Sequence, residues 1–539
     1  MFSLFPSTLV SGPESVNRVT RRCKRRQGGR LRRTAIQATI TLAAAVLAML
    51  TMLVTLAALA VPAMAATASL QVAGPRFETG PCPFPPGVIP PGVRVDCGNL
   101  IVPGDRARAD SSSVSLAVAI IRSPNPAPAP DPILFLADGP GGGGLDWLTY
   151  FVTSAPDLRA DRDIILLDQR GTGYSLPSLR CFEFDSLERA ARARQLSLAQ
   201  TQDLDLQTAA ACHDRLAAAG VQLSAYTTGA AAADIKDLRL ALGYLEWNLY
   251  GLGYGSRLAL TVLRDYPDGV RSVVLDSAQP PQVAGWETAA ANANRAFNAL
   301  FVACGLQPAC NAAYPGLGLK FAEAVDRLKA TPVSVQVLDP LTGSPSPVLF
   351  TGQTLIAGVA RALADGRQGL VPYLPLAITQ LDAGSAAMAE GFATSLSAGP
   401  DLMHSGLWYS VQCHDEAPLN DRARIQADAN AFPRFRDFIL SDTTLAICPG
   451  WGAGQADSKE SRPVRSDVPA LVLAGEYDPL QPPVWSQLAA STLQHSIYYL
   501  LPGVGHGASL QGCGQVLVVQ FMADPNLAPK PPLSSATPT

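Results

Sequence analysis

Three segments that lie far apart in the sequence carry residue types that could hydrolyse an acyl bond. The first, residues 247–256, reads Trp-Asn-Leu-Tyr-Gly-Leu-Gly-Tyr-Gly-Ser, which is typical of a strand, a sharp glycine-rich bend and the start of a helix. In the G-x-S-x-G pattern such a bend presents a nucleophilic serine at its centre. Gly251 and Gly255 fill the flanking positions, but the central residue is Gly253, so the attacking hydroxyl is missing.

Asp478 and His506 could supply the other two groups of a catalytic triad. Asp478 follows an apolar strand, and His506 lies in a glycine-rich loop before the last helical segment. A histidine in a triad takes the proton of the nucleophile, and the carboxylate holds its tautomer and stabilises its cation. The order of bend, acid and histidine along the chain fits this chemistry. We therefore predict His506 as the base and Asp478 as its partner, with position 253 lacking the nucleophile.

The run Asp-Gly-Pro-Gly-Gly-Gly-Gly at 138–144 predicts an oxyanion hole. It follows an apolar strand, and its backbone N–H groups, those of Gly139 and Gly141 above all, could approach a substrate carbonyl together with the N–H of Tyr254. Asp138, at the start of the run, would place a carboxylate beside this hole. Its negative charge would oppose the charge that develops on the substrate oxygen.

Strands that alternate with helices must position these segments. Each apolar strand before a glycine-rich loop fits a parallel sheet, whose site lies at the carboxyl ends of the strands. Besides the strand before the bend, the predicted strands are Asn99–Pro103, Val114–Ile121, Ile133–Leu136, Asp163–Asp168, Arg271–Asp276, Ala470–Ala474 and Ile497–Leu501. The predicted helices around them are Ala231–Leu245, Arg257–Tyr266 and Cys513–Ala523.

Between the two parts of this sheet the strand signal fades, and alanine-rich helical stretches take over at 286–301, 318–329 and 353–363. We interpret this region as an inserted helical lid, and residues 66–95 as irregular. The predicted organisation is a leader at 1–65, a sheet domain at 66–280 and 464–523, a helical lid at 281–463, and a disordered tail at 524–539.

The N-terminus predicts export. Residues 1–33 carry nine Lys or Arg and one acid, whereas 34–65 carry no charge and end in Ala-Met-Ala. This is the pattern of a signal peptide, although the apolar segment 34–65 could anchor the chain in a membrane if it is retained. We expect a secreted or cell-envelope protein. Without residues 1–65 the chain carries 32 basic and 43 acidic residues, which argues against nucleic acid as a partner.

The cysteines fit an oxidising compartment. Cys23 lies in the leader, and sequence proximity favours the pairs 82–97, 181–212, 304–310 and 413–448, with Cys513 left over, although connectivity stays open at this stage. Cysteines and histidines with zinc spacing are absent from the sequence. We expect neither a metal nor a cofactor.

Taken together, the chain resembles the tripeptidyl aminopeptidase and proline iminopeptidase group of serine peptidases, in particular exported bacterial members with a TAP-like C-terminal segment. The resemblance runs from about residue 82 to 525. The matching motifs are G-P-G-G at 139–142, D-Q-R-G-T-G-Y-S at 168–175, D-I-K-D-L-R-L-A-L-G at 234–243, W-N-L-Y-G at 247–251, V-V-L-D-S at 273–277, A-G-E-Y-D at 474–478 and G-H-G at 505–507.

This resemblance implies an α/β-hydrolase fold: a mostly parallel sheet flanked by helices, with an inserted helical lid. It also implies cleavage of short peptides, or of similar small acyl substrates, near a free amino terminus. Asp415 and Glu416 in the lid would then hold the substrate ammonium group. The chain departs from the family at Gly253, where serine is expected, at Asp138, where glycine is expected, and at Gln481, which replaces the usual threonine.

Several interpretations remain open. The protein is either an aminopeptidase-type hydrolase that works without the serine, a catalytically inactive protein that binds peptides or a partner, or an esterase-like hydrolase. Ser256 could substitute as nucleophile, or His506 could activate a water. The glycine pattern after a strand, with Asp276 at a later strand end, could also indicate a dinucleotide site, but that would leave Asp478 and His506 unexplained.

Overall fold

The described residues, which lie between 74 and 530, belong to one compact unit. The predicted leader at 1–65 lies outside the described residues. Within the described ranges, we find no helix whose length and apolarity would suffice for a membrane crossing. The computed structural model describes residues 74–185, 196–338, 344–366, 369–397 and 403–530.

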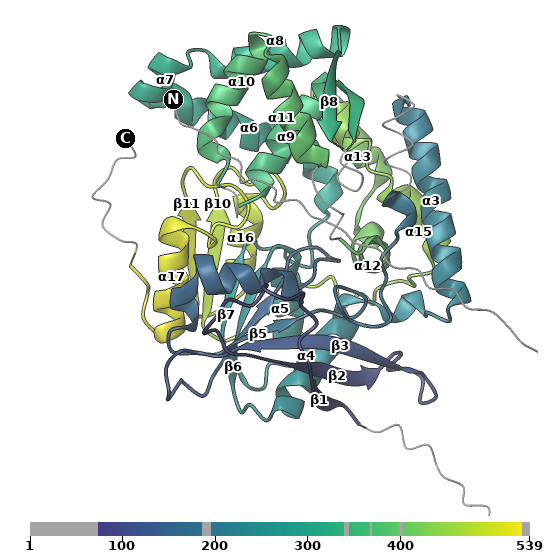
Figure 1. Ribbon diagram of the computed structural model, residues 1–539, viewed down its shortest axis with the longest axis vertical. Coiled ribbons are helices and arrows are strands. Elements are labelled where there is room, and N and C mark those ends of the chain that lie inside the picture. Colours follow the sequence, from purple (N-terminus) through teal and green to yellow (C-terminus); the bar gives the residue numbers. More distant parts are fainter. Residues whose placement is uncertain (1–73, 186–195, 339–343, 367–368, 398–402, 531–539) are drawn as a thin grey trace, which may run out of the picture. The chain divides into compact units, whose positions relative to one another are not determined.

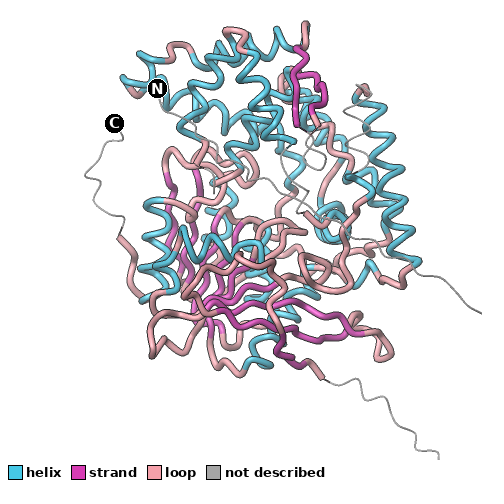
Figure 2. Tube along the Cα trace, in the orientation of Figure 1, coloured by secondary structure: helices cyan, strands magenta, loops and turns pink. Residues whose placement is uncertain are grey.

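A nine-stranded sheet forms the centre of this unit, in the order β1-β2-β3-β5-β4-β6-β7-β10-β11 (Figures 1 and 2). The six strands from β5 to β11 run parallel, whereas β1, β2 and β3 form antiparallel pairs at one edge. The strands are β1 Arg76–Gly80, β2 Val95–Pro103, β3 Ser113–Ile121, β4 Ile133–Leu136, β5 Ile164–Leu167, β6 Trp247–Leu252, β7 Val270–Asp276, β10 Ala470–Gly475 and β11 Ser496–Leu501.

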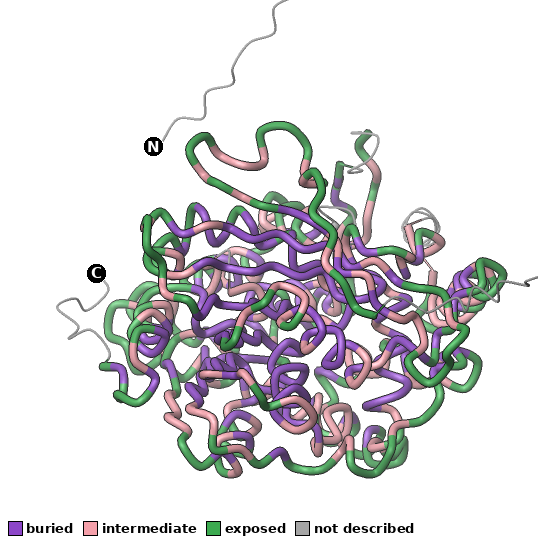
Figure 3. The backbone as a smooth tube through the Cα atoms, turned by 90° about the horizontal axis from the view of Figure 1, so that it is seen from below, coloured by how far each residue is buried: buried purple, intermediate pink, exposed green. Residues whose placement is uncertain are grey.

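The central strands are apolar on both faces because helices cover both. Figure 3 shows buried backbone running through the middle of the molecule. One face packs against residues of α4, α5 and α16, and the other against α17 and the turns at 145–158. These helices are α4 Thr228–Leu242, α5 Tyr254–Asp265, α16 Pro483–Ala490 and α17 Gly512–Ala523. The architecture confirms the predicted fold class, and the predicted strands and sheet-domain helices recur within a few residues of their expected bounds.

The register of the parallel strands brings the chemical segments together. Leu136 of β4 pairs with Gly251 of β6, so Asp138 and Gly253, each two residues further on, emerge side by side. On the other side, Gly475 of β10 pairs with Leu501 of β11, and the loops that follow carry Asp478 and His506. All four residues therefore leave the same edge of the sheet.

A second apolar core lies in the region between α5 and β10 in sequence, and it is largely helical. The longer helices and the strands of this helical region, which begins after β7, are α6 Ala289–Leu306, α7 Pro308–Ala313, α8 Leu317–Ala330, β8 Val333–Leu338, β9 Pro345–Phe350, α9 Gly352–Ala364, α10 Leu374–Asp382, α11 Ala386–Ser397, α12 Ser405–Val411, α13 Arg422–Ala431, α14 Arg436–Ile439 and α15 Thr444–Trp451. A further helix, α3 Leu198–Ala218, packs against α15.

Two expectations about strands are wrong. Residues 76–80, predicted as irregular, form the edge strand β1, because its backbone pairs with β2 and this pairing does not require an apolar pattern. The helical region also contains an antiparallel hairpin of β8 and β9. Its signal was the alternation of buried Val335 and Val337 with exposed neighbours, which the surrounding alanine-rich helices obscured.

The four predicted disulfides are confirmed. Cys82 is bonded to Cys97, Cys181 to Cys212, Cys304 to Cys310, and Cys413 to Cys448. Cys513 is the free, exposed cysteine among the described residues. Of the predicted tail, residues 524–530 are described, and the Pro529 carbonyl accepts a hydrogen bond from the Tyr499 hydroxyl; residues 531–539 lie outside the described part.

A buried ion pair joins two of the sequence motifs. Arg170 donates two hydrogen bonds to Asp234 of α4, each 2.7 Å long, and both side chains are only 1% exposed. The same guanidinium also binds the carbonyls of Gly104 and Ala225. These motif residues therefore fix α4 and the neighbouring loops to one another, which is a structural role.

Replacing Asp234 by Asn should lower the free energy of unfolding by about 3–5 kcal/mol, because Arg170 would stay buried without its counter-charge. Denaturant unfolding followed by tryptophan fluorescence measures this change. Asp110→Asn, whose ion pair with Arg108 is exposed, is the matched control and should change stability little. Equal effects of the two substitutions would contradict the structural role.

Candidate active site

The bend between β6 and α5 is built as a tight strand-to-helix turn. Gly253 has φ +54° and ψ −117°, a conformation that L side chains rarely adopt, and its N–H donates to the Asp276 carbonyl at 2.9 Å. A Cβ on Gly255 would lie 2.0 Å from the Leu136 carbonyl oxygen, so this glycine allows α5 to approach β4 closely. The turn therefore has the strained geometry that presents a nucleophile, but no side chain at its centre.

His506 and Asp478 meet directly. Nδ1 of His506 lies 3.0 Å from Oδ2 of Asp478, and both side chains are almost fully buried. The other oxygen of Asp478, Oδ1, accepts the backbone N–H groups of Leu480 and Gln481 at 2.8 and 2.9 Å. This carboxylate is thus fixed on both sides and can orient the imidazole.

Asp276 supports the histidine loop from beneath. Its carboxylate accepts the backbone N–H groups of Ala508 and Ser509 at 2.9 and 2.8 Å, while Ser277 Oγ accepts the N–H of Gly507 at 3.0 Å. Asp276 is fully buried, and burial raises its pKa. It therefore acts as a structural residue at the end of β7 and is not free to bind a ribose.

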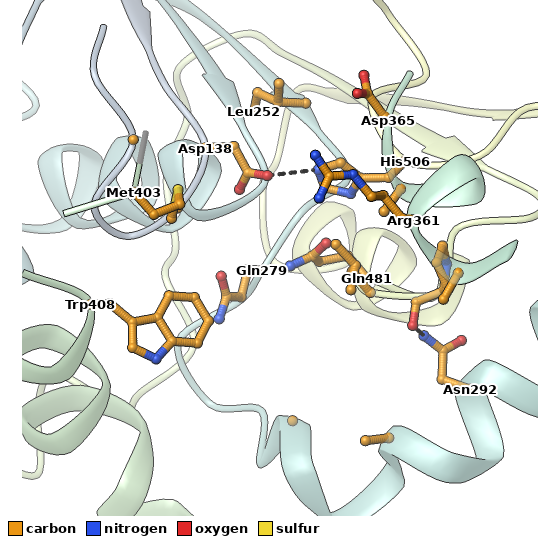
Figure 4. Close-up of a pocket in the computed structure, with 18 of the residues that line it drawn as sticks. Asp138, Leu252, Gln279, Asn292, Arg361, Asp365, Met403, Trp408, Gln481 and His506 are labelled. Atoms are coloured by element: carbon orange, nitrogen blue, oxygen red, sulfur yellow. Dashed lines mark hydrogen bonds and ion pairs between the residues drawn. The ribbon is translucent and has the colours of Figure 1, made fainter. Parts of the chain in front are cut away.

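The carboxylate of Asp138 occupies the space that a serine side chain at position 253 would need. A Cβ built on Gly253 would lie 1.9 Å from Asp138 Oδ1. The same oxygen accepts the N–H of Tyr254 at 2.9 Å, and Oδ2 lies 3.0 Å from His506 Nε2, as the close-up in Figure 4 shows. Asp138 therefore fills the space that a serine hydroxyl would occupy. It also accepts the N–H of Tyr254, a predicted oxyanion donor, and contacts His506 Nε2, the nitrogen that would accept the serine proton.

These contacts make His506 a cation between two anions. Burial alone would lower the pKa of His506, but the carboxylates of Asp478 and Asp138 outweigh it and hold that pKa well above its usual value. For Asp138, burial acts to raise the pKa, yet the His506 charge and the N–H groups of Tyr254 and Gly139 keep it below its usual value. The raised pKa favours the protonated ring, which has no lone pair to accept a proton.

The glycine loop that carries two of the predicted oxyanion donors contacts the segment before α12. Gly139 lines the cavity next to Asp138. The Gly141 carbonyl accepts the backbone N–H of His404 at 2.9 Å, and a Cβ on Gly141 would meet His404 backbone atoms. The glycine loop is therefore fastened to the segment before α12.

A cavity of about 740 Å³ lies above this array, between the carboxyl edge of the sheet and the helical region (Figure 4). Four tryptophans contribute to its wall, Trp147, Trp286, Trp408 and Trp485. Among the described residues, five carboxylates line the cavity, together with one arginine, Arg361, and His506. These acids are Asp138, Asp146, Asp365, Glu416 and Asp442.

The two acids predicted to bind a substrate ammonium group occupy different places in the π-helical turn η7, Gln412–Glu416. Glu416 lines the cavity, where Oε1 accepts hydrogen bonds from Arg257 and Gln279, while Oε2 receives none from the described residues. Burial raises the pKa of Glu416. Asp415 lies behind it and is bonded to His414 and to the Thr228 hydroxyl, away from the cavity lining.

The remaining candidates from the sequence have structural partners. Ser256 is buried; its hydroxyl donates to the Gly253 carbonyl and accepts the Gln279 N–H, so it does not face the cavity. His414, Asp415 and Glu460 bring possible metal-binding atoms within 4.8 Å of one another. Burial acts to lower the pKa of His414, but the hydrogen bond to Asp415 outweighs it and raises that pKa.

Sequence reasoning missed two features of the site. It treated Asp138 as a disturbance of the oxyanion hole and did not foresee its contacts with His506 and the Gly253 position. It also gave Gln481 no role, yet this residue lines the cavity and its Oε1 has no hydrogen-bond partner among the described residues. The strand register of β4 and β6 was the information that the sequence could not supply for Asp138.

Comparisons with known proteins agree with this architecture. Residues 132–301 match the family model described as alpha/beta hydrolase fold, and residues 434–531 match the model described as TAP-like protein. The chain is 24% identical over 444 residues to the serine protease Hip1 of Mycobacterium tuberculosis, which covers 77% of this chain and 82% of that protein. Together with the fold, these matches support a place for the chain in the α/β-hydrolase peptidase family.

Two further similarities lie within this family. The tripeptidyl aminopeptidase of Streptomyces coelicolor is 30% identical over 158 residues, 28% of each chain. The crystal structure of a proline iminopeptidase from Mycobacterium smegmatis has a TM-score of 0.38 at 16% identity and covers 80% of this chain and 99% of its own. The turn at Gly251–Gly255 lies within the part that matches the alpha/beta hydrolase fold model, and its central residue, Gly253, carries no hydroxyl.

Replacing Asp138 by Asn should lower the pKa of His506 towards its ordinary value, because one of the two carboxylates that hold the cation is removed. An NMR titration of the imidazole measures this directly. Because folding raises the pKa of His506, its protonation adds to the free energy of unfolding. This contribution is complete below about pH 6.5, the usual pKa of histidine, and is lost as pH rises through the pKa of the folded state. The Asn variant should lose it at lower pH than the wild type; identical titrations would contradict the ion pair.

Gly253→Ser alone should not create peptidase activity, because the new side chain would collide with Asp138 and would face a protonated His506. Combining it with Asp138→Gly should raise hydrolysis of amino-terminally free chromogenic tripeptides at least ~10³-fold above either single variant. Initial rates at pH 7–8 test this, and Asp138→Gly alone is the control. A single Gly253→Ser variant as active as the double variant would show that Asp138 does not block the site.

Proposed function

We propose that this α/β-hydrolase binds the free amino-terminal end of short peptides in its cavity and does not cleave them by serine chemistry. The contact of Asp138 with both Tyr254 N–H and His506 carries this proposal. Serine-type hydrolysis needs a nucleophile, an unprotonated base and free oxyanion donors. The Asp138 carboxylate fills the space of the nucleophile, favours the protonated form of the base and occupies the Tyr254 N–H. The site is therefore suited to holding a ligand rather than to acyl transfer.

Peptide recognition would rest on the negative lining of the cavity. Glu416 offers its Oε2 to a ligand ammonium group, and the other pocket carboxylates favour a cation over an anion. Gln481 Oε1 could accept a hydrogen bond from a peptide N–H. The four tryptophans supply apolar and cation–π contacts for side chains.

Hydrolysis by a water that His506 activates, on peptides or on esters, has less support. A water would need an unprotonated Nε2, but that nitrogen faces Asp138 and the pKa of the ring is raised by the two carboxylates. An incoming carbonyl oxygen would also have to displace Asp138 from Tyr254. Both requirements weigh against an active aminopeptidase or esterase in the wild-type chain.

Export to a secreted or envelope location is part of the proposal. Four disulfides among the described residues fit an oxidising compartment. The basic and apolar segments of residues 1–65 would direct this export. Whether residues 34–65 remain as an anchor is decided by sequencing the N-terminus of the mature protein.

Calorimetry with a non-chromogenic tripeptide amide should show binding, whereas its amino-acetylated form should bind at least ~10-fold more weakly because the ammonium group is lost. Affinity should also fall as pH is lowered through the raised pKa of Glu416, since a neutral carboxyl attracts a cation poorly. No release of chromophore is expected from matching chromogenic tripeptides.

Glu416→Gln should weaken binding of the free tripeptide about 10–100-fold, because the ammonium loses its charged partner. Glu323→Gln, at an exposed position of α8, is the matched control and should leave affinity unchanged. Equal affinity of wild-type protein for the free and acetylated peptides would refute ammonium recognition without relying on any variant.

A further inference from the structure

The two oxygens of Asp138 have different surroundings. Oδ1 accepts the Tyr254 N–H at 2.9 Å, which is the donor position where hydrolases hold an oxyanion, and Oδ2 lies 3.0 Å from His506 Nε2. The side chain keeps 32% of its surface exposed and lines the cavity, so a ligand can reach it. A carboxylate held in this way resembles a nucleophile that already has a base and an oxyanion donor beside it.

We infer that Asp138 is a catalytic nucleophile and that the cavity hydrolyses alkyl halides through an ester formed on this carboxylate. Carboxylates are established nucleophiles in covalent catalysis. Attack on an acyl carbon would give a mixed anhydride, which is more reactive than the ester or amide consumed. Attack on a saturated carbon gives an ordinary ester, which is a stable intermediate. This activity does not depend on peptide binding.

In the first step one Asp138 oxygen, Oδ2, attacks the carbon that bears the halogen. The new C–O bond forms as the carbon–halogen bond breaks, and the halide leaves with the bonding electron pair. In-line displacement sends the leaving group away from Oδ2, whereas the His506 proton lies beside Oδ2. His506 therefore cannot protonate the departing group, so the substrate must release a stable anion; epoxides, which leave an alkoxide, should react far more slowly.

Ester formation prepares His506 for the second step. Once Asp138 has lost its charge, the imidazolium keeps only Asp478 as an anionic partner, its pKa falls, and it can release its proton to water. Neutral His506 then takes a proton from a water that attacks the ester carbonyl. The charge that develops on Oδ1 is stabilised by the Tyr254 N–H, which already points at this atom.

Collapse of this intermediate restores the starting site. The alkoxide leaves with the proton from His506 as an alcohol, and the Asp138 carboxyl group returns one proton to His506. The sum is alkyl halide plus water giving alcohol, halide ion and one proton, with no oxidant or cofactor. The oxygen of the attacking water stays in the Asp138 carboxylate after the first turnover.

The surroundings of Asp138 suit an apolar alkyl chain. Leu252 and Met403 lie near the carboxylate in Figure 4, and Trp147 lines the same cavity. Because the substrate is uncharged, the acidic lining does not repel it. Primary bromides are the simplest substrates, since they combine an unhindered carbon with a good leaving group.

The test incubates the purified protein with bromoethane, 1-bromobutane and 1-bromohexane and measures bromide and alcohol. Wild-type protein should release both at least ~100-fold faster than buffer with one of the three, and Asp138→Asn should reduce the rate at least ~10³-fold. The matched control Asp268→Asn, at an exposed position after α5, should keep the wild-type rate. 1,2-Epoxyhexane should react at least ~10-fold more slowly than 1-bromohexane.

Two further measurements identify the covalent step. His506→Gln should accumulate one alkyl group per protein on the peptide that contains Asp138, as seen by mass spectrometry after digestion. A single turnover in H₂¹⁸O should label Asp138 and leave the alcohol unlabelled. The inference is overturned if none of the bromides is turned over and no adduct forms, if Asp138→Asn retains the activity, or if the first alcohol carries the label. None of these outcomes bears on peptide binding, which is measured with different ligands.

Discussion

The site depends on one buried cation, the His506 imidazolium, held between the carboxylates of Asp478 and Asp138. Both contacts are 3.0 Å long, and the fully buried carboxylate of Asp478 needs this positive partner. The loops around them are arranged to keep this charge balance: Asp478 is fixed by two backbone N–H groups, and Asp276 ties the histidine loop to β7. The same interaction removes the free base that a serine peptidase needs.

Positions 138 and 253, where the sequence departs from the peptidases it resembles, are adjacent in the structure. A Cβ at 253 and the Asp138 carboxylate would occupy the same volume, because β4 and β6 pair in a register that places their ends side by side. A side chain at position 253 and the carboxylate of Asp138 therefore exclude one another in this structure.

The helical region lines the cavity and also contributes a charged residue, Glu416, that forms an ion pair with the sheet domain. Arg257, in the first turn of α5, forms a buried ion pair with Glu416 of η7, so the elbow helix and the cavity wall are linked electrostatically. His404 fastens the glycine loop to the segment before α12. Ligands that enter between the sheet edge and the helices thus meet a wall whose position is coupled to the elbow itself.

The sequence alone predicted the fold class, the strand-bend-helix at Gly253 and candidate roles for Asp478 and His506, and it favoured the four disulfide pairs that the structure contains. It could do so because these features depend on local pattern, spacing and order along the chain. It missed β1 and the β8–β9 hairpin, whose stability comes from backbone pairing with distant strands. The contact of Asp138 with His506 was decided only by tertiary structure. The two residues are 368 positions apart, and no local pattern encodes the strand register and loop packing that bring them within hydrogen-bonding distance.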